Sequence, residues 1–295
     1  MKVLVLGSQG QVGRCLADQF NRTDFDVFYT VRKEIDLSNL DHTKIAILEL
    51  SPDVIINAAA FAAVDQAETD IKEAFLINDT AVANLANICK EAGIWLIHIS
   101  TDYVFDGLSK KSYKETDPTN PQSIYGKSKL NGELAIQKTE CKFLIIRTAW
   151  LFSEYGSNFM KTMLHLSETH SEVKVVADQF GCPTYAHDLA KAIVCILPLL
   201  ARELDSGIYH YTGNPKCSWA EFAQFIFDEV KKQSKLGLSP KVIPINSSEY
   251  PTAAKRPSNS DLDTSLFESK FQHKSRNWSD GVSETIKLWS VQKFT

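Results

Sequence analysis

The sequence predicts an α/β protein with one parallel sheet that carries helices on both faces, followed by a smaller C-terminal lobe. Short apolar runs at residues 2–6, 53–57 and 94–99 lack the alternation of polar and apolar residues that marks a half-exposed strand. Such runs are typical of strands buried on both faces of a parallel sheet. Stretches with a helical pattern separate them, and this order specifies a doubly wound parallel sheet with right-handed crossovers.

The first strand–helix unit carries a glycine-rich turn. A strand at Lys2–Leu6 runs into three glycines spaced Gly-x-x-Gly-x-x-Gly, and a helix is expected over Arg14–Asn21. Glycines here permit a tight turn and let backbone N–H groups at a helix N-terminus approach a pyrophosphate. A turn without a ligand is the alternative, but the spacing favours a dinucleotide and points to the short-chain dehydrogenase branch of the Rossmann folds. The predicted contacts are Gly7, Gln9, Gly10, Gln11, Val12 and Gly13.

The second strand, Asp26–Thr30, ends in a basic pair. A Rossmann domain selective for NAD usually places a carboxylate here, on the adenosine ribose. Arg32 and Lys33 occupy the corresponding loop, and a guanidinium suits the 2′-phosphate of NADP. The sequence therefore favours NADPH and leaves NADH open, since solvated loop charges are the alternative. Asp36 and Leu37 are the predicted contacts of the adenine.

The third strand, Asp53–Asn57, follows a helix over Leu40–Leu50 and opens into three alanines. Small side chains let the backbone lie against the ribose and diphosphate of a dinucleotide. Ala58, Ala59 and Ala60 are therefore predicted contacts, and a helix over Phe75–Gly93 then leads to the fourth strand.

The fourth strand, residues 94–99, delivers Thr101 to its carboxyl end, and a helix expected over Ser123–Lys138 presents Tyr125 and Lys129. Four residues apart on a helix, the phenol and the ammonium share one face. Hydride transfer to a carbonyl carbon leaves negative charge on the oxygen, and Tyr125 is the predicted acid that protonates it. Lys129 is expected to lower the pKa of this phenol, ordinarily about 10, and to bind the nicotinamide ribose. Thr101 is expected to hold the carbonyl oxygen, so this chemistry requires no metal.

A Tyr-x-x-x-Lys spacing is weak evidence by itself, because nine tyrosines and frequent lysines give about one match by chance. Tyr29 and Lys33 also match, in the loop that ends the second strand. The Tyr125 pair gains weight from its place on the helix that follows the fourth strand, and a solvated pair is the alternative.

The alternation of strands and helices becomes irregular beyond about residue 150. A strand at Phe143–Arg147 places Trp150 at the sheet edge, and a helix at His187–Leu200 is expected to return to the sheet. The predicted division assigns residues 1–150 and 173–200 to the dinucleotide-binding domain, and residues 151–172 and 201–295 to a substrate-binding lobe. The other expected elements are helices at Ser157–Ser167 and Trp219–Lys232, strands at Val173–Val176 and Gly207–Thr212, and turn-rich segments at 178–184 and 239–262.

Composition and charge exclude several classes of function. With 44% hydrophobic and 23% charged residues the chain is globular, and a net charge of −4 argues against nucleic acid or an anionic membrane as partner. The six cysteines form no Cys-x-x-Cys pair, so reduced thiols are expected rather than zinc ligands or disulfides. No signal peptide or membrane span is recognisable, and a cytoplasmic protein is predicted.

Seven segments carry a resemblance to a known family. They are the glycine turn at 7–13, Asn57-Ala-Ala-Ala60, Val64-Asp65-x-Ala-Glu68, Ser100-Thr-Asp-Tyr-Val-Phe-Asp-Gly107, Tyr125-Gly-Lys-Ser-Lys129, Asp178-Gln-Phe-Gly-x-Pro-Thr184 and Arg256-Pro-Ser-Asn259-Ser260. In this order they resemble the dTDP-4-dehydrorhamnose reductases, which are extended short-chain dehydrogenases. The resemblance implies NAD(P)H-dependent reduction of the C4 ketone of dTDP-4-dehydro-6-deoxy-L-mannose to dTDP-L-rhamnose.

The resemblance also implies roles for individual residues. Thr101, Tyr125 and Lys129 match the family's catalytic positions. Trp150 is expected to offer an indole face to the apolar side of a deoxysugar, with a core position as the alternative, and Arg256 is expected to clamp the diphosphate. The implied substrate contacts are Thr101, Asp102, Val104, Phe105, Trp150, Asn158, Gln179, Arg256 and Asn259.

The chain departs from the family pattern in two places. Phe61 and Ala62 stand where the family often has histidine and threonine, so one polar contact is missing. Members that bind magnesium at a dimer contact use glutamates where this chain has Cys15 and His187, and neither is a ligand for a hard cation. We therefore expect no metal, and either a monomer or a homodimer. The alternatives are a reductase of another nucleotide-4-ketosugar and a non-catalytic regulatory subunit like the methionine adenosyltransferase β subunit.

Overall fold

Six parallel strands form the central sheet of the protein, as the sequence predicts. The computed structural model describes residues 1–202, 204–233 and 239–294. In spatial order the strands are β2, β1, β3, β4, β5 and β10, and every pairing is parallel. Their bounds are Asp26–Thr30, Lys2–Leu6, Val54–Asn57, Trp95–Thr101, Phe143–Thr148 and Gly207–His210. Because β1 lies between β2 and β3, the strand order reverses between β1 and β3, and the ligand site of such a fold lies beyond the carboxyl ends of the strands at this point.

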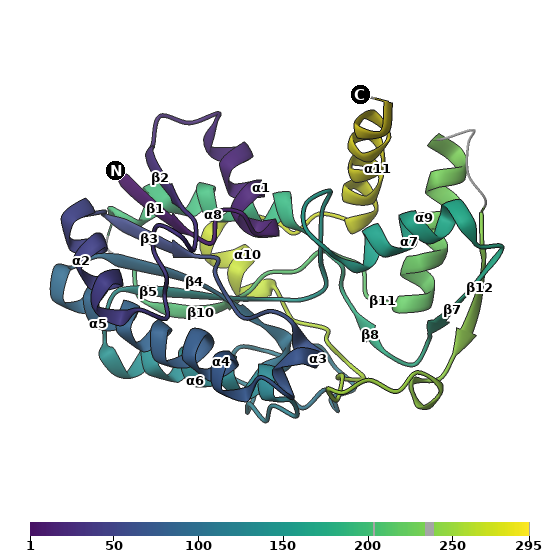
Figure 1. Cartoon of the computed structure of the whole chain (residues 1–295), viewed down its shortest axis with the longest axis horizontal. Helices are drawn as coiled ribbons and strands as arrows, with labels where there is room; N and C mark the ends of the chain where they lie inside the picture. Colours follow the sequence, from purple (N-terminus) through teal and green to yellow (C-terminus); the bar gives the residue numbers. More distant parts are fainter. Residues whose placement is uncertain (203, 234–238, 295) are drawn as a thin grey trace.

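Helices cover both faces of the sheet (Figure 1). Val3 and Val5 of β1 pack into the hydrophobic cluster with helices α1 (Gln11–Phe20) and α8 (Ala186–Leu200). Leu4 and Leu6 point the other way, into the cluster with α2 (Leu40–Leu50), α5 (Ala81–Ala92) and α6 (Ile124–Thr139). This burial on both faces explains why the strands read as continuous apolar runs.

The helix predicted over Phe75–Gly93 is interrupted. It consists of α4 (Ile71–Phe75), a π-helical turn (Leu76–Thr80) and α5, which ends at Gly93 with φ +71°. The turn directs the buried side chain of Asn78 away from its own helix. Its Oδ1 accepts from the N–H of Phe61 at 2.9 Å, and its Nδ2 donates to the Oγ of Ser128 at 3.0 Å. Asn78 thereby ties the segment after β3 to α6.

A second lobe lies beside the carboxyl ends of the sheet strands, at the right of Figure 1. An aromatic-rich cluster that includes Phe152, Phe222, Phe227 and Trp278 holds it together. The helices of this lobe are α7 (Phe159–Thr169), α9 (Trp219–Gln233) and α11 (Trp278–Phe294), and its parallel strand pair is β7 (Glu172–Val176) with β12 (Lys241–Ile245). Shorter pairs join β6 (Leu151–Phe152) to β9 (Thr184–Tyr185) and β8 (Phe180–Gly181) to β11 (Cys217–Ser218). The remaining elements are α3 (Val64–Ala67), α10 (Ser265–Phe271) and two 3₁₀ turns at Asp102–Val104 and Ser247–Glu249.

Two strands lie elsewhere than in the predicted division between domains. Strand β10, assigned to the substrate-binding lobe, extends the large sheet beside β5, and its Tyr209 packs with Phe267 and Phe271 of α10. Strand β7, assigned to the dinucleotide-binding domain, pairs with β12 in the second lobe. Both strands are short, and their partners are distant in sequence, so local pattern gives no sign of the sheet that they join. Residues 203, 234–238 and 295 of the predicted lobe lie outside the described residues. Among the helices that the structure describes, none has the length and apolar character to cross a bilayer.

Candidate active site

The glycine turn after β1 forms a close-packed cradle at the N-terminus of α1. Gly7 has φ +76°, and a Cβ there would lie 2.7 Å from the backbone nitrogen of Ala59. A Cβ on Gly13 would collide with the carbonyl oxygen of Gly7. Gly10 precedes α1 and supplies no side-chain cap, so the first N–H groups of this helix are available to an anion. The residues present therefore fit the diphosphate of a dinucleotide.

A cavity of about 170 Å³ continues from this cradle along the ends of β1 and β2. Of the predicted contacts it is lined by Gly7, Arg32, Asp36, Leu37, Ala59 and Ala60. Six further residues that were not among the predicted contacts also line the cavity: Leu6, Val31, Ile35, Phe61, Glu73 and Ile77. The predicted contacts Val12 and Ala58 pack into the core beneath the sheet instead, and Gln9 is exposed.

Arg32 lies at the mouth of this cavity, with about 70% of its side chain exposed. Its guanidinium reaches Glu73 at 3.2 Å and Asp36 at 3.5 Å. Asp36 also accepts hydrogen bonds from the backbone and hydroxyl of Ser38, which lower its pKa. The basic group predicted to favour NADP is therefore held by two carboxylates in the free protein.

Thr101, Tyr125 and Lys129 meet at the carboxyl end of β4. Thr101 is the last residue of that strand, and Tyr125 is the second residue of α6. The N-terminus of α6 is fixed by Ser123, which caps the N–H of Gly126, and by Glu68, which accepts from the N–H of Ile124 at 2.8 Å. Tyr103 packs edge-on against Tyr125, with ring centroids 5.5 Å apart.

The phenol of Tyr125 is held in its protonated form. Burial raises its pKa to about 12, although a hydrogen bond with the Thr101 side chain acts in the opposite direction. The sequence predicts a pKa lowered by Lys129, whereas in the free protein burial dominates and raises it. Burial acts on Lys129 as well, where it disfavours the ammonium and lowers the pKa to about 8.

The amine of Lys129 points into the protein rather than to solvent, and only 2% of this residue is exposed. Its Nζ donates to the carbonyl oxygen of Ile99 at 2.7 Å and lies 3.0 Å from Nε2 of His98. His98 in turn lies 3.1 Å from the side chain of Asn57. Neither His98 nor Asn57 was a candidate from sequence, although two polar residues within buried strands are a signal that could have found them.

Asp102 lies next to Thr101 and is buried. Its Oδ1 accepts from the Thr101 hydroxyl at 3.0 Å. Burial raises the pKa of Asp102 to about 6, and hydrogen bonds from Ser260 and Thr101 oppose this shift. The predicted substrate contact Asp102 therefore contributes a carboxyl group that can be neutral near pH 6 beside the candidate acid.

A buried ion pair supports the other side of α6. Glu133, one turn after Lys129, receives Nη2 of Arg147 at 2.6 Å and Nε at 3.0 Å. The Ser100 hydroxyl donates to the same carboxylate at 2.5 Å. Because Ser100 and Arg147 lie on β4 and β5, this network fixes α6 against the strand that carries Thr101.

A larger cavity, of about 560 Å³, opens in the second lobe between α7, β7 and the segment that carries Arg256. Gln179 and Arg256, both predicted substrate contacts, line it together with Phe159, Trp219 and Tyr250. Arg256 forms an ion pair with Asp65 at 3.0 Å, and its Nε has no partner among the described residues. The cavity thus combines aromatic surface with a guanidinium.

Trp150 does not line this cavity, but it supports a residue that does. Its indole stacks on Trp219, with ring centroids 3.4 Å apart and planes 7° from parallel. Trp150 has φ +49°, and a Cβ on Gly181 would lie 2.6 Å from its ring. Trp219 was not a candidate from sequence, where the helical pattern placed it only as the first residue of a helix, and neither were Phe159 and Tyr250.

Four other predicted substrate contacts have structural roles for their side chains. Val104 and Phe105 are buried in a cluster with Tyr113 and Leu262, so in the free protein their side chains are covered. Asn158 caps α7 through the N–H of Lys161 and donates to Gln11 at 2.6 Å. Asn259 donates to the carbonyl oxygens of Ser109 and Lys111, both at 3.0 Å. The side-chain amides of Asn158 and Asn259 are thus both engaged in hydrogen bonds that connect neighbouring segments of the chain.

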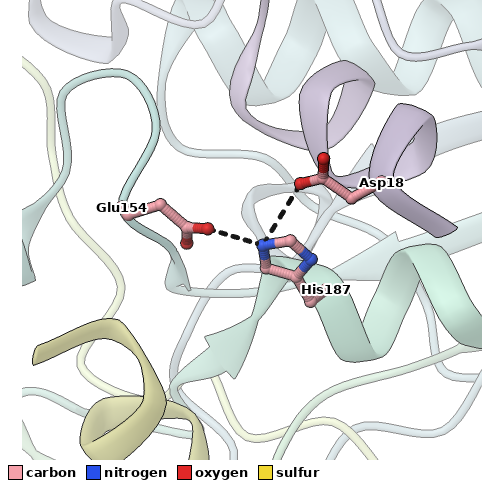
Figure 2. Close-up of side chains that lie close together, drawn as sticks. All are labelled: Asp18, Glu154 and His187. Atoms are coloured by element: carbon pink, nitrogen blue, oxygen red, sulfur yellow. Dashed lines mark hydrogen bonds and ion pairs between the residues drawn. The ribbon is translucent and has the colours of Figure 1, made fainter. Parts of the chain in front are cut away.

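Cys15 and His187, which stand where metal-binding members of the family carry glutamates, belong to a cluster of polar side chains in this protein. Figure 2 shows that Asp18 and Glu154 both point toward the ring of His187. Nε2 of His187 lies 2.9 Å from Glu154 and 3.8 Å from Asp18, and Asp18 also accepts from the Tyr155 hydroxyl at 2.9 Å. Cys15 is fully buried nearby, where burial and the charge of Glu154 raise its pKa. These contacts join α1, α8 and the segment after β6, and they leave Oε2 of Glu154 without a partner among the described residues.

A doubly wound sheet with a dinucleotide cradle and a Thr–Tyr–Lys set at its carboxyl edge defines an oxidoreductase of the extended short-chain dehydrogenase class. The model of the RmlD substrate binding domain family matches residues 1–291. The chain therefore belongs to the dTDP-4-dehydrorhamnose reductase family.

Individual relatives agree with this assignment. The chain is 41% identical to a dTDP-4-dehydrorhamnose reductase of Aggregatibacter actinomycetemcomitans, over 94% of this chain and 95% of the relative. It is 39% identical to that of Escherichia coli K12, over 97% of each chain. Among solved structures, a dTDP-4-dehydrorhamnose reductase of Clostridium acetobutylicum superposes with a TM-score of 0.92 at 38% identity, over 98% of this chain and 100% of that one. That of Bacillus anthracis, solved in complex with NADP, superposes with a TM-score of 0.90 at 34% identity, over 97% and 99%.

Proposed function

We propose that the protein reduces the C4 ketone of dTDP-4-dehydro-6-deoxy-L-mannose to dTDP-L-rhamnose, with NADPH or NADH as reductant. The observation that carries this proposal is the Tyr125 phenol, which is protonated, hydrogen-bonded to Thr101 and located at the edge of the sheet where the cradle also lies. The names of the relatives supply the substrate class. The enzyme is further proposed to act in the cytoplasm as a monomer or homodimer, and its free cysteines suit a reducing compartment.

The bound nicotinamide cofactor supplies the hydride. The hydroxyls of Thr101 and Tyr125 hold the carbonyl oxygen between them, so both hydrogen bonds strengthen as negative charge develops on it. Tyr125 then gives its proton to this oxygen. In the free protein the Thr101 hydroxyl donates to Asp102, so on substrate binding it must turn its single proton from that carboxylate to the carbonyl oxygen. Lys129 lies behind the phenol on the same helix. No step in this scheme uses a metal ion.

The large cavity of the second lobe is the proposed site of the dTDP portion. Arg256 is placed to pair with the diphosphate, in competition with Asp65. Trp219, Phe159 and Tyr250 offer apolar surface to the nucleoside, and Trp150 holds Trp219 in position.

A direct assay tests the proposed reaction. The protein is mixed with dTDP-4-dehydro-6-deoxy-L-mannose and NADPH or NADH, the loss of cofactor absorbance is followed, and the product is identified. We expect dTDP-L-rhamnose. If the protein shows no turnover under conditions where a known reductase is active, the proposal is refuted and the role of a non-catalytic regulatory subunit is favoured. If it turns over only another nucleotide-4-ketosugar, the reaction class stands and the proposed substrate is wrong.

An Arg32→Ala variant tests the preference for NADP. We expect Arg32 to leave its ion pairs with Glu73 and Asp36 and to bind the 2′-phosphate when NADPH binds. The variant should then lose affinity for NADPH by about tenfold and keep its affinity for NADH. Fluorescence titration of both cofactors measures the two affinities, and Lys33→Ala is the matched control from the same loop. An equal loss for both cofactors would mean that Arg32 does not select between them.

Removal of divalent cations is expected to leave turnover unchanged, because proton donation and oxyanion binding both come from side chains of the chain. Protein treated with EDTA and then passed through a desalting column is compared with untreated protein in the same assay. Loss of activity that added magnesium restores would contradict this expectation.

A further inference from the structure

A chain of buried polar contacts runs from the cofactor cradle to Lys129. The backbone N–H of Ala59 donates to Oδ1 of Asn57 at 3.1 Å. The same amide places its Nδ2 3.1 Å from Nδ1 of His98, and Nε2 of His98 lies 3.0 Å from Nζ of Lys129. Asn57, His98 and Lys129 are all at most 2% exposed, so water does not replace these partners.

The direction of each hydrogen bond in this chain follows from its first member. A backbone N–H can only donate, so the oxygen of the Asn57 amide faces Ala59 and the NH₂ group faces His98. Nδ1 of His98 is therefore an acceptor. Burial and the nearby Lys129 keep the pKa of His98 well below its ordinary value, and a neutral imidazole that accepts at Nδ1 carries its proton on Nε2.

The Nε2–H group then points at Nζ of Lys129, which must offer a lone pair. An ammonium has no lone pair, whereas a neutral amine accepts this bond and still donates to the carbonyl of Ile99. The only other charged side chain that acts on Lys129 among the described residues is Glu133 on its own helix, which favours the ammonium. Arg147 from β5 and Ser100 from β4 already occupy that carboxylate.

We propose that His98 is a positioning residue of this site, whose Nε2–H tautomer, selected by Asn57, favours the neutral amine form of Lys129 in the free protein. To charge Lys129 the imidazole must move its proton to Nδ1, which turns the Asn57 amide and breaks its bond with Ala59. The charge of Lys129 is thereby coupled to the backbone that lines the cofactor cavity. With a neutral amine behind it, the Tyr125 phenol stays protonated and ready to act as an acid. The catalytic part of this inference rests on the proposed function, and the tautomer does not.

The tautomer is tested directly in the free protein. Nitrogen-15 shifts of labelled histidine distinguish a protonated from an unprotonated ring nitrogen, and the signal that disappears in His98→Gln belongs to His98. We expect the proton on Nε2 at pH 9, where the neutral amine of Lys129 predominates. A proton on Nδ1 overturns the proposal, whether or not the protein reduces a ketosugar.

An Asn57→Asp variant reverses the selection with little change in shape. Its carboxylate accepts from both Ala59 and Nδ1–H of His98, which frees Nε2 to accept from an ammonium. Lys129 then stays charged, the phenolate of Tyr125 is favoured, and the alkaline limb of kcat/KM for ketone reduction moves to lower pH by about one unit. If the new carboxylate acted by its charge alone, it would oppose the phenolate and move this limb to higher pH. The direction in which the limb moves therefore distinguishes the two explanations.

The control is Asn131→Asp, on the solvent-facing side of α6, where the side chain contacts Asp79; its pH profile is expected to match the wild type. A limb that is unchanged or moves upward in folded Asn57→Asp protein overturns the coupling. If Asn57→Asp fails to fold, the nitrogen-15 measurement on the wild type still decides for or against the tautomer.

Discussion

A Tyr125→Phe variant is expected to lose about 100- to 10,000-fold of turnover while it binds the cofactor with nearly unchanged affinity. The substitution removes one hydroxyl from a ring that also packs edge-on against Tyr103, so the shape of the site is kept. What is lost is the acid that protonates the substrate oxygen and one of its two hydrogen-bond donors. Steady-state kinetics with the ketosugar and fluorescence titration of the cofactor measure the two effects separately.

The sequence offers a matched control for this variant. Tyr29 and Lys33 repeat the Tyr-x-x-x-Lys spacing, but Tyr29 lies on the edge strand β2 and is partly exposed. Tyr29→Phe is therefore expected to keep wild-type turnover. If Tyr125→Phe retains turnover within about threefold of wild type, another group is the acid, and Asp102 with its raised pKa is the next candidate.

The parts of this protein that could be predicted from sequence are those whose signal is local. Strands β1, β3 and β4 are buried on both faces, so their apolar composition identifies them. The Tyr125–Lys129 pair was found because helical spacing and a preceding strand end are both local features. Strand β10 was misassigned because it is four residues long and contains His210, and nothing near it in sequence reveals that β5 is its partner.

The side chains that support the site could not be predicted in the same way. His98 meets Lys129 across 31 positions, and Asn57 meets His98 across 41. Each is a single polar residue in an apolar strand, and sequence alone does not show which buried groups will face each other. Asn158 is a different case, because an asparagine directly before a helical stretch is a known cap signal that the resemblance to the family outweighed.

An Arg147→Met variant is expected to lose about 3–5 kcal/mol of stability, a large share of the ~5–15 kcal/mol of an ordinary domain. Methionine fills the space of the apolar part of the arginine side chain but has no guanidinium. The Glu133 carboxylate then stays buried with only the Ser100 hydroxyl as a partner from the sheet. The cost arises from this uncompensated charge, so it falls when the charge is removed as well. The double variant Glu133→Met with Arg147→Met is therefore expected to recover much of the loss.

Urea denaturation followed by far-UV circular dichroism measures these free energies. Lys44→Met is the matched control, because Lys44 and Glu91 form an ion pair of similar length, 2.7 Å, with both side chains largely exposed; its loss is expected to stay within about 0.5 kcal/mol. The comparison separates burial from ion pairing as the source of the effect. If Arg147→Met costs no more than the control, the Glu133–Arg147 pair does not hold α6 on the sheet, and the position of Lys129 must depend on its contacts with His98 and Ile99 alone.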